Sequence, residues 1–325
     1  MKLFICEFIT GGGMQNVDLP ESLAREGDMM LCALLADLHD AGFDDIFCTR
    51  DARLDKPGIN IEIVIPGNDV WQTWQQCIQE SNAVWIIAPE TGEVLYELST
   101  MVINQGCFLV GCTPEAVKIC SSKRETLKLL GNKGVPCVPV LEDINAVTEC
   151  DNGWVIKPDD GVGCEDSYLF NELEALKTYI RHPDRKNFIV QEYIKGIPAS
   201  ISMLCHGGSA KLLSCNEQLF NFENGKGQLQ GIIINGLRQY VDEFNEIARR
   251  VTAAIEGLQG YVGIDLIISD NGPLVLEINP RLTTAYAGLR QSLGVNPAAV
   301  ILETLQSGRL ADMVGVDYHP VTIRF

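Results

Sequence analysis

The chain has 325 residues, of which 46% are hydrophobic and 21% are charged. It is therefore long enough for two or three packed lobes, and its composition is that of a globular enzyme rather than a disordered chain. The 25 basic and 43 acidic residues give a net charge of −18, which argues against nucleic acid and anionic membranes as partners. A phosphate site in such a protein must rely on a few placed lysines and a metal.

Twelve cysteines are spread from Cys6 to Cys215 without a CxxC pair. A chain of this length does not need disulfides, so we expect reduced thiols in a cytoplasmic protein. The apolar start is interrupted by Glu7 and lacks a cleavage site for a secretory signal. No apolar stretch approaches the roughly 18 residues of a membrane span.

The first part of the chain alternates short apolar runs with helical patterns, which predicts a parallel sheet with helices on its faces. After the first run, Gly11 to Gly13 predict a turn, in which Gly12 either approaches the substrate or serves only the turn. The expected strands lie at 1–9, 44–50, 60–66, 83–90 and 107–112, and the expected helices at 20–41, 69–80 and 93–105.

The remainder has a mixed α+β pattern. A helix is expected to begin at Pro114, with Gly134 and Pro136 as stop signals. From about residue 197 strands dominate. The other expected elements are strands at 153–158 and 187–194 and helices at 171–182, 242–257 and near 296–306.

Residues 261–284, YVGIDLIISDNGPLVLEINPRLTT, predict two strands that carry Asp265, Glu277 and Asn279 within apolar runs. Alternation places Glu277 and Asn279 on one face. A three-residue loop, 271–273, keeps Pro273 out of the ladder and sets Asp265 opposite Asn279. Carboxylates this close need compensation, so we expect Mg²⁺ or Mn²⁺ there. The alternative is a solvent-facing polar stripe.

Two lysines favour a metal site over a solvent-facing polar stripe at this hairpin. Lys157 ends a strand before a loop with Gly161 and Gly163, where backbone N–H groups can contact phosphate. Lys123 begins a helix, where a cation is unfavourable unless an anion lies nearby. The strand that ends at 191–194 can offer backbone groups to a purine. Each element alone has an ordinary explanation, but their order and spacing together indicate an ATP site.

With these motifs, residues 114–290 resemble the ATP-grasp superfamily of carboxylate–amine ligases, on Lys123, VIKP with Lys157, VQEYIKG and GIDLIISDNGPLVLEINPR. The resemblance implies α/β and α+β parts: an N-terminal pre-ATP-grasp, Rossmann-like domain (1–113), a small ATP-grasp lobe (114–190) and a large lobe with the metal site (191–325). It implies ATP with Mg²⁺ or Mn²⁺ and, since members are often dimers, suggests a homodimer. Carried over by position, the nucleotide contacts are Lys123, Lys157, Gly161, Gly163, Gln191, Glu192, Tyr193 and Ile194, and the metal ligands are Asp265, Glu277 and Asn279.

Two positions depart from the family pattern. Many members have an acidic ribose contact where this chain has Pro198, and many dipeptide ligases have an arginine where it has Gly263. Arg281 in EINPR is expected to take over the anion-stabilising role of that arginine. The catalytic assignments are therefore Arg281 and Lys157.

Substrate contacts are expected from residues near the metal ligands. Thr283 and Thr284 follow them directly, unless a threonine only caps the next helix. Asn216 and Gln218 reach the site from a neighbouring strand, unless they are buried amides that satisfy backbone groups. Cys164 has no conspicuous histidine partner, so a nucleophilic role is disfavoured.

Finer motifs are similar to the tyramine–glutamate ligase branch of the superfamily, which acts in methanofuran assembly. These are CEFITGGG, IAPETGEVL, GCTPEAVKICSSK, KPDDGVGCED, GIPASISML and EINPRLTTAYAGL. The resemblance implies small-molecule substrates, an amino acid and an amine, joined through an acyl phosphate. Alternatives are another amino acid ligase and a module that senses ATP without turnover. Both lysines and all three metal ligands are present, which disfavours the sensor.

Overall fold

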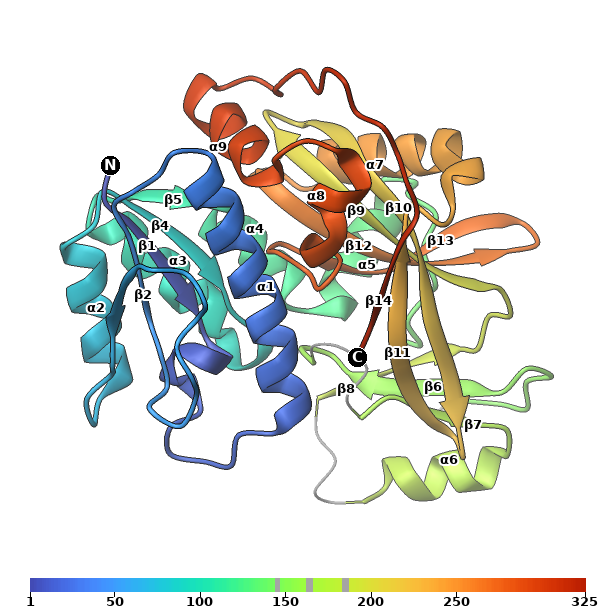
Figure 1. Cartoon of the computed structure of the whole chain (residues 1–325). Helices are drawn as coiled ribbons and strands as arrows, with labels where there is room; N and C mark the ends of the chain where they lie inside the picture. The colour runs from blue at the N-terminus through green and yellow to red at the C-terminus, as the bar shows by residue number, and fades with distance from the viewer. Residues whose placement is uncertain (144–146, 162–165, 183–186) are drawn as a thin grey trace.

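The computed structural model describes residues 1–143, 147–161, 166–182 and 187–325, so the predictions for Gly163 and Cys164 lie outside the described residues. Figure 1 shows two sheets side by side, one from the N-terminal part of the chain and one from the remainder. Within those ranges no helix is both long and apolar enough to cross a bilayer. The eleven cysteines they contain are free thiols, as the cysteine spacing predicts.

The N-terminal sheet is parallel throughout, with strand order β3-β2-β1-β4-β5, and it confirms the predicted α/β pattern. Every residue of β1 and β4 is buried, as continuous apolar runs predict for central parallel strands. The order of the strands reverses between β1 and β4, so the carboxyl ends of these two strands flank a crevice. The elements are β1 (Leu3–Glu7), α1 (Glu21–Asp40), β2 (Ile46–Thr49), β3 (Glu62–Val64), α2 (Val70–Gln79), β4 (Ala83–Ile87), α3 (Val94–Asn104) and β5 (Phe108–Val110).

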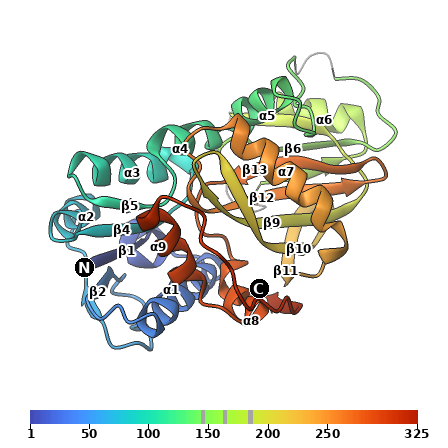
Figure 2. The same cartoon turned by 90° about the horizontal axis from the view of Figure 1, so that it is seen from above.

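The second sheet is antiparallel, with the order β13-β12-β9-β10-β11-β7-β6-β8 and with β14 paired to β11. Figure 2 shows α5 and α7 on one face of this sheet, where they contact β13, β9 and β10. Its elements are β6 (Trp154–Pro158), β7 (Tyr168–Phe170), α6 (Leu173–Ile180), β8 (Phe188–Glu192), β9 (Ile197–His206), β10 (Ser209–Glu223), β11 (Lys226–Ile234), α7 (Val241–Ala254), β12 (Gly260–Ser269), β13 (Gly272–Asn279), α8 (Tyr286–Leu293), α9 (Pro297–Ser307) and β14 (Val321–Arg324).

The segment between the two sheets forms two helices, α4 (Pro114–Cys120) and α5 (Lys123–Asn132), rather than the single helix expected from Pro114. Ser122 has an extended backbone, and its side chain accepts a hydrogen bond from the backbone N–H of Glu125. It therefore caps α5 and separates it from α4. Lys123 is the first residue of α5, as predicted.

The N-terminal domain is docked on the second sheet's helices through Asp37 of α1. The Tyr286 hydroxyl donates to Asp37 Oδ2 over 2.8 Å, and Arg290 Nη1 donates to Asp37 Oδ1 over 3.3 Å. The Asn296 side chain donates to the backbone carbonyl of Asp37 over 2.7 Å. Burial raises the pKa of Asp37, although Tyr286 and Arg290 oppose the shift. Helix α1 is thus joined through Asp37 to two residues of α8 and to Asn296, the N-cap residue of α9.

We predict that Tyr286→Phe lowers the free energy of unfolding by about 1–2 kcal/mol, because the buried Asp37 carboxyl loses a hydrogen-bond donor. Urea denaturation of the variant and the wild type gives this difference. Tyr240→Phe is the matched control, since the Tyr240 hydroxyl has no hydrogen-bond partner among the described residues. Equal losses in the two variants would contradict the assignment.

Candidate active site

The β12–β13 hairpin brings the predicted metal ligands together, but in a different register from the one expected. Asp265 lies opposite Glu277, and Asn279 lies opposite Gly263. The predicted pairing of Asp265 with Asn279 is therefore wrong. So is the predicted three-residue loop, because Ser269 pairs with Gly272 across a two-residue turn.

The two-residue turn, with Pro273 in the ladder, is possible because β13 is an edge strand of the sheet. Pro273 pairs with Ile268, a position that the sequence argument excluded because proline cannot donate to a ladder. β13 is the last strand at its end of the sheet, and proline is tolerated on edge strands. Gly272 has a φ of 103°, a left-handed conformation that glycine adopts without strain.

A β-bulge in β13 decides which side chains face the site. Asp265 pairs with Glu277 and Leu266 pairs with Val275, which leaves Leu276 without an opposite residue. A bulge re-aims the side chains on one side of it. Val275 and Ile278 are buried in the core, whereas Leu276 and Glu277 both line a cavity. Strict alternation along β13 would place Leu276 on the same face as Ile278, and the bulge breaks this alternation.

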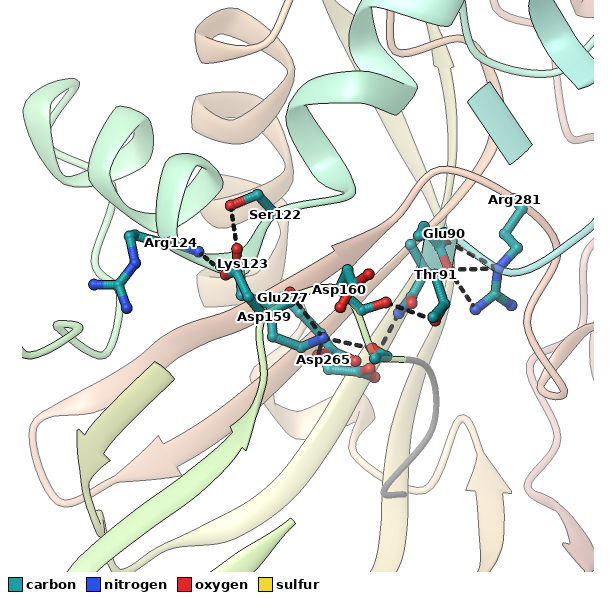
Figure 3. A network of polar contacts seen from close by, with 12 residues as sticks. Glu90, Thr91, Ser122, Lys123, Arg124, Asp159, Asp160, Asp265, Glu277 and Arg281 are labelled. Atoms are coloured by element: carbon teal, nitrogen blue, oxygen red, sulfur yellow. Dashed lines mark hydrogen bonds and ion pairs between the residues drawn. The ribbon is translucent and has the colours of Figure 1, made fainter. Parts of the chain in front are cut away.

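Nitrogen donors contact both carboxylates of the hairpin, and Figure 3 shows Lys123 beside Glu277. Gln218 Nε2 donates to Asp265 Oδ1 over 2.7 Å, and Asn279 Nδ2 donates to Asp265 Oδ2 over 3.1 Å. Lys123 Nζ lies 3.1 Å from Glu277 Oε2. The structure thus groups all three predicted metal ligands with one predicted phosphate contact and one predicted substrate contact.

The two carboxyl groups have opposite pKa shifts. Burial, together with the neighbouring charge of Glu277, raises the pKa of Asp265 to about 7. Burial also opposes ionisation of Glu277, but the positive charges of Lys123 and Lys157 more than offset it and lower the pKa of Glu277. A divalent cation would relieve the repulsion that holds a proton on Asp265. Two carboxylates and an amide oxygen are hard donors, so this set fits Mg²⁺ or Mn²⁺.

Lys123 is held in place by the end of β6. The Asp159 carboxylate accepts hydrogen bonds from Ser122 Oγ over 2.7 Å and from the Arg124 backbone N–H over 2.8 Å. A carboxylate at a helix N-terminus is favourable, so Asp159 ties the start of α5 to β6. Lys123 Nζ donates to the Gly161 carbonyl over 2.5 Å. Sequence reasoning missed Asp159, although the KPDD motif contains it.

A cavity of about 440 Å³ extends from the carboxylates along β6, β8 and β10, a volume typical of small-ligand sites. The Gln191 side chain donates to the Val138 carbonyl over 2.8 Å at its wall. Pro198 also lines it, at the position where many family members have an acid. The lining includes these predicted nucleotide contacts and apolar groups: Lys157, Gln191, Glu192, Tyr193, Ile194, Phe220, Phe222, Leu229, Ile267 and Leu276.

Two predicted substrate contacts are explained by packing elsewhere. Asn216 is fully buried; its side chain donates to Ser200 and Ser202 and accepts from the Asn235 backbone N–H. This is the alternative in which a buried amide satisfies other polar groups. Gly12 has a φ of 105°, and a Cβ there would lie 2.8 Å from Pro66. The tight-turn explanation accounts for this glycine.

Thr283 explains why position 263 is a glycine. A Cβ at Gly263 would lie 2.6 Å from the methyl group of Thr283, so there is no room for the arginine that other family members have. The Thr283 hydroxyl is 2.7 Å from the Tyr261 hydroxyl. The N-cap of α8 is Ala285, without a side-chain hydrogen bond, so neither Thr283 nor Thr284 caps that helix as the alternative required.

Arg281 forms a buried ion pair with a residue of the N-terminal domain. Its Nε donates to both oxygens of Glu90 over 3.0 and 3.1 Å, and its Nη2 donates to Glu90 Oε2 over 3.0 Å. The side chains of Arg281 and Glu90 are only 12% and 6% exposed. Burial alone would lower the pKa of Arg281, but Glu90 more than compensates and raises it. Sequence reasoning missed Glu90, which lies in the motif IAPETGEVL.

Comparisons with known proteins agree with this architecture. The ATP-grasp domain family matches residues 120–285, and the pre ATP-grasp 3 domain family matches residues 45–117. The chain is similar to the tyramine–L-glutamate ligases of Methanocaldococcus jannaschii (26% identity, covering 87% of this chain and 83% of the relative) and Methanocaldococcus fervens (28%, 89% of each). A crystal structure of an ATP-grasp superfamily protein from Archaeoglobus fulgidus superposes with a TM-score of 0.77 at 26% identity, covering 100% of this chain and 92% of the other.

We predict that metal-free protein loses stability as the pH rises from about 4 through about 7, because the folded state binds the Asp265 proton more tightly than the unfolded chain does. Asp265→Asn removes this dependence. Between about pH 5 and about pH 8 in EDTA, the free energy of unfolding of the wild type should fall by about 1–3 kcal/mol more than that of the variant. Parallel pH profiles in urea denaturation would show that Asp265 ionises normally.

Proposed function

This chain belongs to the ATP-grasp family, whose members include ATP-dependent carboxylate–amine ligases, and we propose that it joins a carboxyl group of glutamate to tyramine or a similar aromatic amine. The observation that carries the ligase chemistry is the pairing of Asp265 with Glu277 at the end of a nucleotide-sized cavity, beside Lys123. The similarity to two tyramine–L-glutamate ligases supports the choice of substrates. Methanofuran-type cofactor biosynthesis is the setting this choice implies.

The first chemical step is transfer of the γ-phosphoryl group of ATP to the carboxylate, which yields ADP and an acyl phosphate. Such transfers depend on positioning and charge neutralisation. Lys123 and Lys157 supply fixed positive charge at this end of the cavity. Asp265, Glu277 and Asn279 would hold Mg²⁺ or Mn²⁺, which supplies further neutralisation of the phosphates when bound.

In the second step the amine nitrogen attacks the acyl carbon and loses a proton, and the C–O bond to phosphate breaks. The products are the amide and inorganic phosphate. Negative charge develops on the former carbonyl oxygen, and a preorganised donor that meets this charge lowers the barrier. Arg281 follows the metal ligands by two residues and is kept cationic by Glu90, so it is the donor we assign to this charge.

We predict that ATP, Mg²⁺ and glutamate give ADP and a new product mass only when tyramine or a close analogue is added. Amines are tested one at a time, and ADP and product mass are followed. Turnover with a different acid and amine would identify another amino acid ligase of the same family. ATP left intact under every condition would indicate a sensor that binds ATP without turnover.

We predict that Glu277→Gln lowers turnover by more than about 100-fold, since even the loss of an outer-sphere partner of a metal ligand costs up to that much. The variant keeps the size of the side chain, so its thermal unfolding temperature should stay close to that of the wild type. Glu303→Gln, the same change at an exposed position of α9, is the control and should keep full activity. Near-normal turnover of Glu277→Gln would remove Glu277 from the metal site.

A further inference from the structure

The turn after β4, residues 90–93, contacts both the arginine and the phosphate-loop side of the candidate site (Figure 3). Glu90 binds Arg281. One residue later, Thr91 Oγ1 donates to the backbone carbonyl of Asp160 over 2.7 Å, and the Gly92 N–H lies 3.3 Å from Asp160 Oδ2. The turn follows a strand at the point where the order of the parallel sheet reverses, which is where ligands bind in open α/β sheets.

Glu90 occupies one edge of the Arg281 guanidinium group. A guanidinium has five N–H groups in a planar fork. Glu90 accepts hydrogen bonds from the N–H on Nε and from one N–H on Nη2. The Leu282 carbonyl accepts a hydrogen bond from one N–H on Nη1 over 3.1 Å. Among the described residues this leaves one N–H on Nη1 and one on Nη2. Each of these two N–H groups can donate to an oxygen of an anion.

The charge of this arginine is linked to the metal-ligand cluster. The carboxylates of Glu277 and Asp265 also contribute to the raised pKa of Arg281, after the larger effects of burial and Glu90. Arg281 is therefore within electrostatic reach of the carboxylates that would hold the cation. Both oxygens of Glu90 are used by Arg281, so Glu90 is poorly placed to accept a proton from the amine.

We propose that Glu90 is a positioning residue for the ligase reaction: it holds Arg281 through Nε and Nη2, so that the remaining N–H groups on Nη1 and Nη2 are presented to the carboxyl group that is being activated. This inference rests on the proposed function, because it concerns the acyl-transfer role of Arg281. The N-terminal domain then contributes directly to the geometry of the reaction.

The same turn also relates Arg281 to Lys123. Thr91 and Gly92 hold Asp160, and the carbonyl of the next residue, Gly161, accepts a hydrogen bond from Lys123 Nζ. One turn is thereby connected both to Arg281, the residue assigned to the acyl group, and to Lys123 at the phosphate end. Correct relative placement of two such groups is worth large factors in rate.

We predict that Glu90→Gln lowers kcat by about 10–100-fold, the usual cost of losing a group that orients a ligand or catalytic side chain, while the KM for ATP changes less than about twofold. Gln keeps the size but replaces one acceptor oxygen by an NH₂ group that faces an N–H donor. Glu90→Asp keeps the charge and should recover part of the activity. Glu93→Gln is the control, because Glu93 pairs with Lys118 on the surface of the same turn and should keep full activity.

A double-mutant cycle tests whether Glu90 acts through Arg281. If it does, Glu90→Gln combined with Arg281→Lys should be no slower than Arg281→Lys alone, within about threefold. Acyl phosphate is also measured by trapping with hydroxylamine, which reports the first step whatever the natural amine is. Wild-type-like kcat in Glu90→Gln, or losses that multiply in the double variant, would overturn the proposal.

A spectroscopic readout separates failure of this inference from failure of the proposed function. Absence of both ADP and hydroxamate from the wild type with glutamate would refute the glutamate ligase assignment. The contact between Glu90 and Arg281 is then tested with the Arg281 Nε–H signal in a ¹H–¹⁵N spectrum. This signal is identified by its loss in Arg281→Lys. We expect slow solvent exchange in the wild type and a shifted, faster-exchanging signal in Glu90→Gln. An unchanged signal overturns the proposal even in variants with normal thermal unfolding.

Discussion

Two acidic side chains, Asp265 and Glu277, face each other across β12 and β13 at the wall of the cavity, and the surrounding structure compensates for their charge. Buried carboxylates are costly unless they meet donors or cations. Gln218 and Asn279 donate to Asp265, and Lys123 pairs with Glu277. The compensation is incomplete, since the pKa of Asp265 is still raised to about 7. We therefore propose that a divalent cation completes the compensation at this site.

Local backbone features place these groups. The bulge at Leu276 turns Glu277 toward the cavity while Val275 stays in the core. Ser122 begins α5 at the position that puts Lys123 beside Glu277. Neither feature is a ligand or a catalyst, yet each changes which side chain reaches the cavity.

Two of the links between the N-terminal domain and the ATP-grasp part have different consequences. On α1, Asp37 accepts hydrogen bonds from Tyr286, Arg290 and Asn296. These bonds dock α1 against α8 and the start of α9. After β4, the turn 90–93 contacts Arg281 and Asp160. The first link contributes to the orientation of the domain, and the second uses that orientation to hold an arginine that keeps two N–H donors for an anion.

The sequence by itself determined the parallel N-terminal sheet, the strand-rich remainder, the position of Lys123 at a helix start, and the meeting of Asp265, Glu277 and Asn279 on one hairpin. These follow from periodicity and from the chemistry of neighbouring residues. Tertiary structure alone decided the register of the hairpin, because a bulge depends on the packing of Val275 in the core. It also decided that Asn216 is a packing residue and that Glu90 holds Arg281. Glu90 and Arg281 are 191 positions apart, and no local pattern encodes a contact between residues so distant, because only the docking of the two domains brings them together.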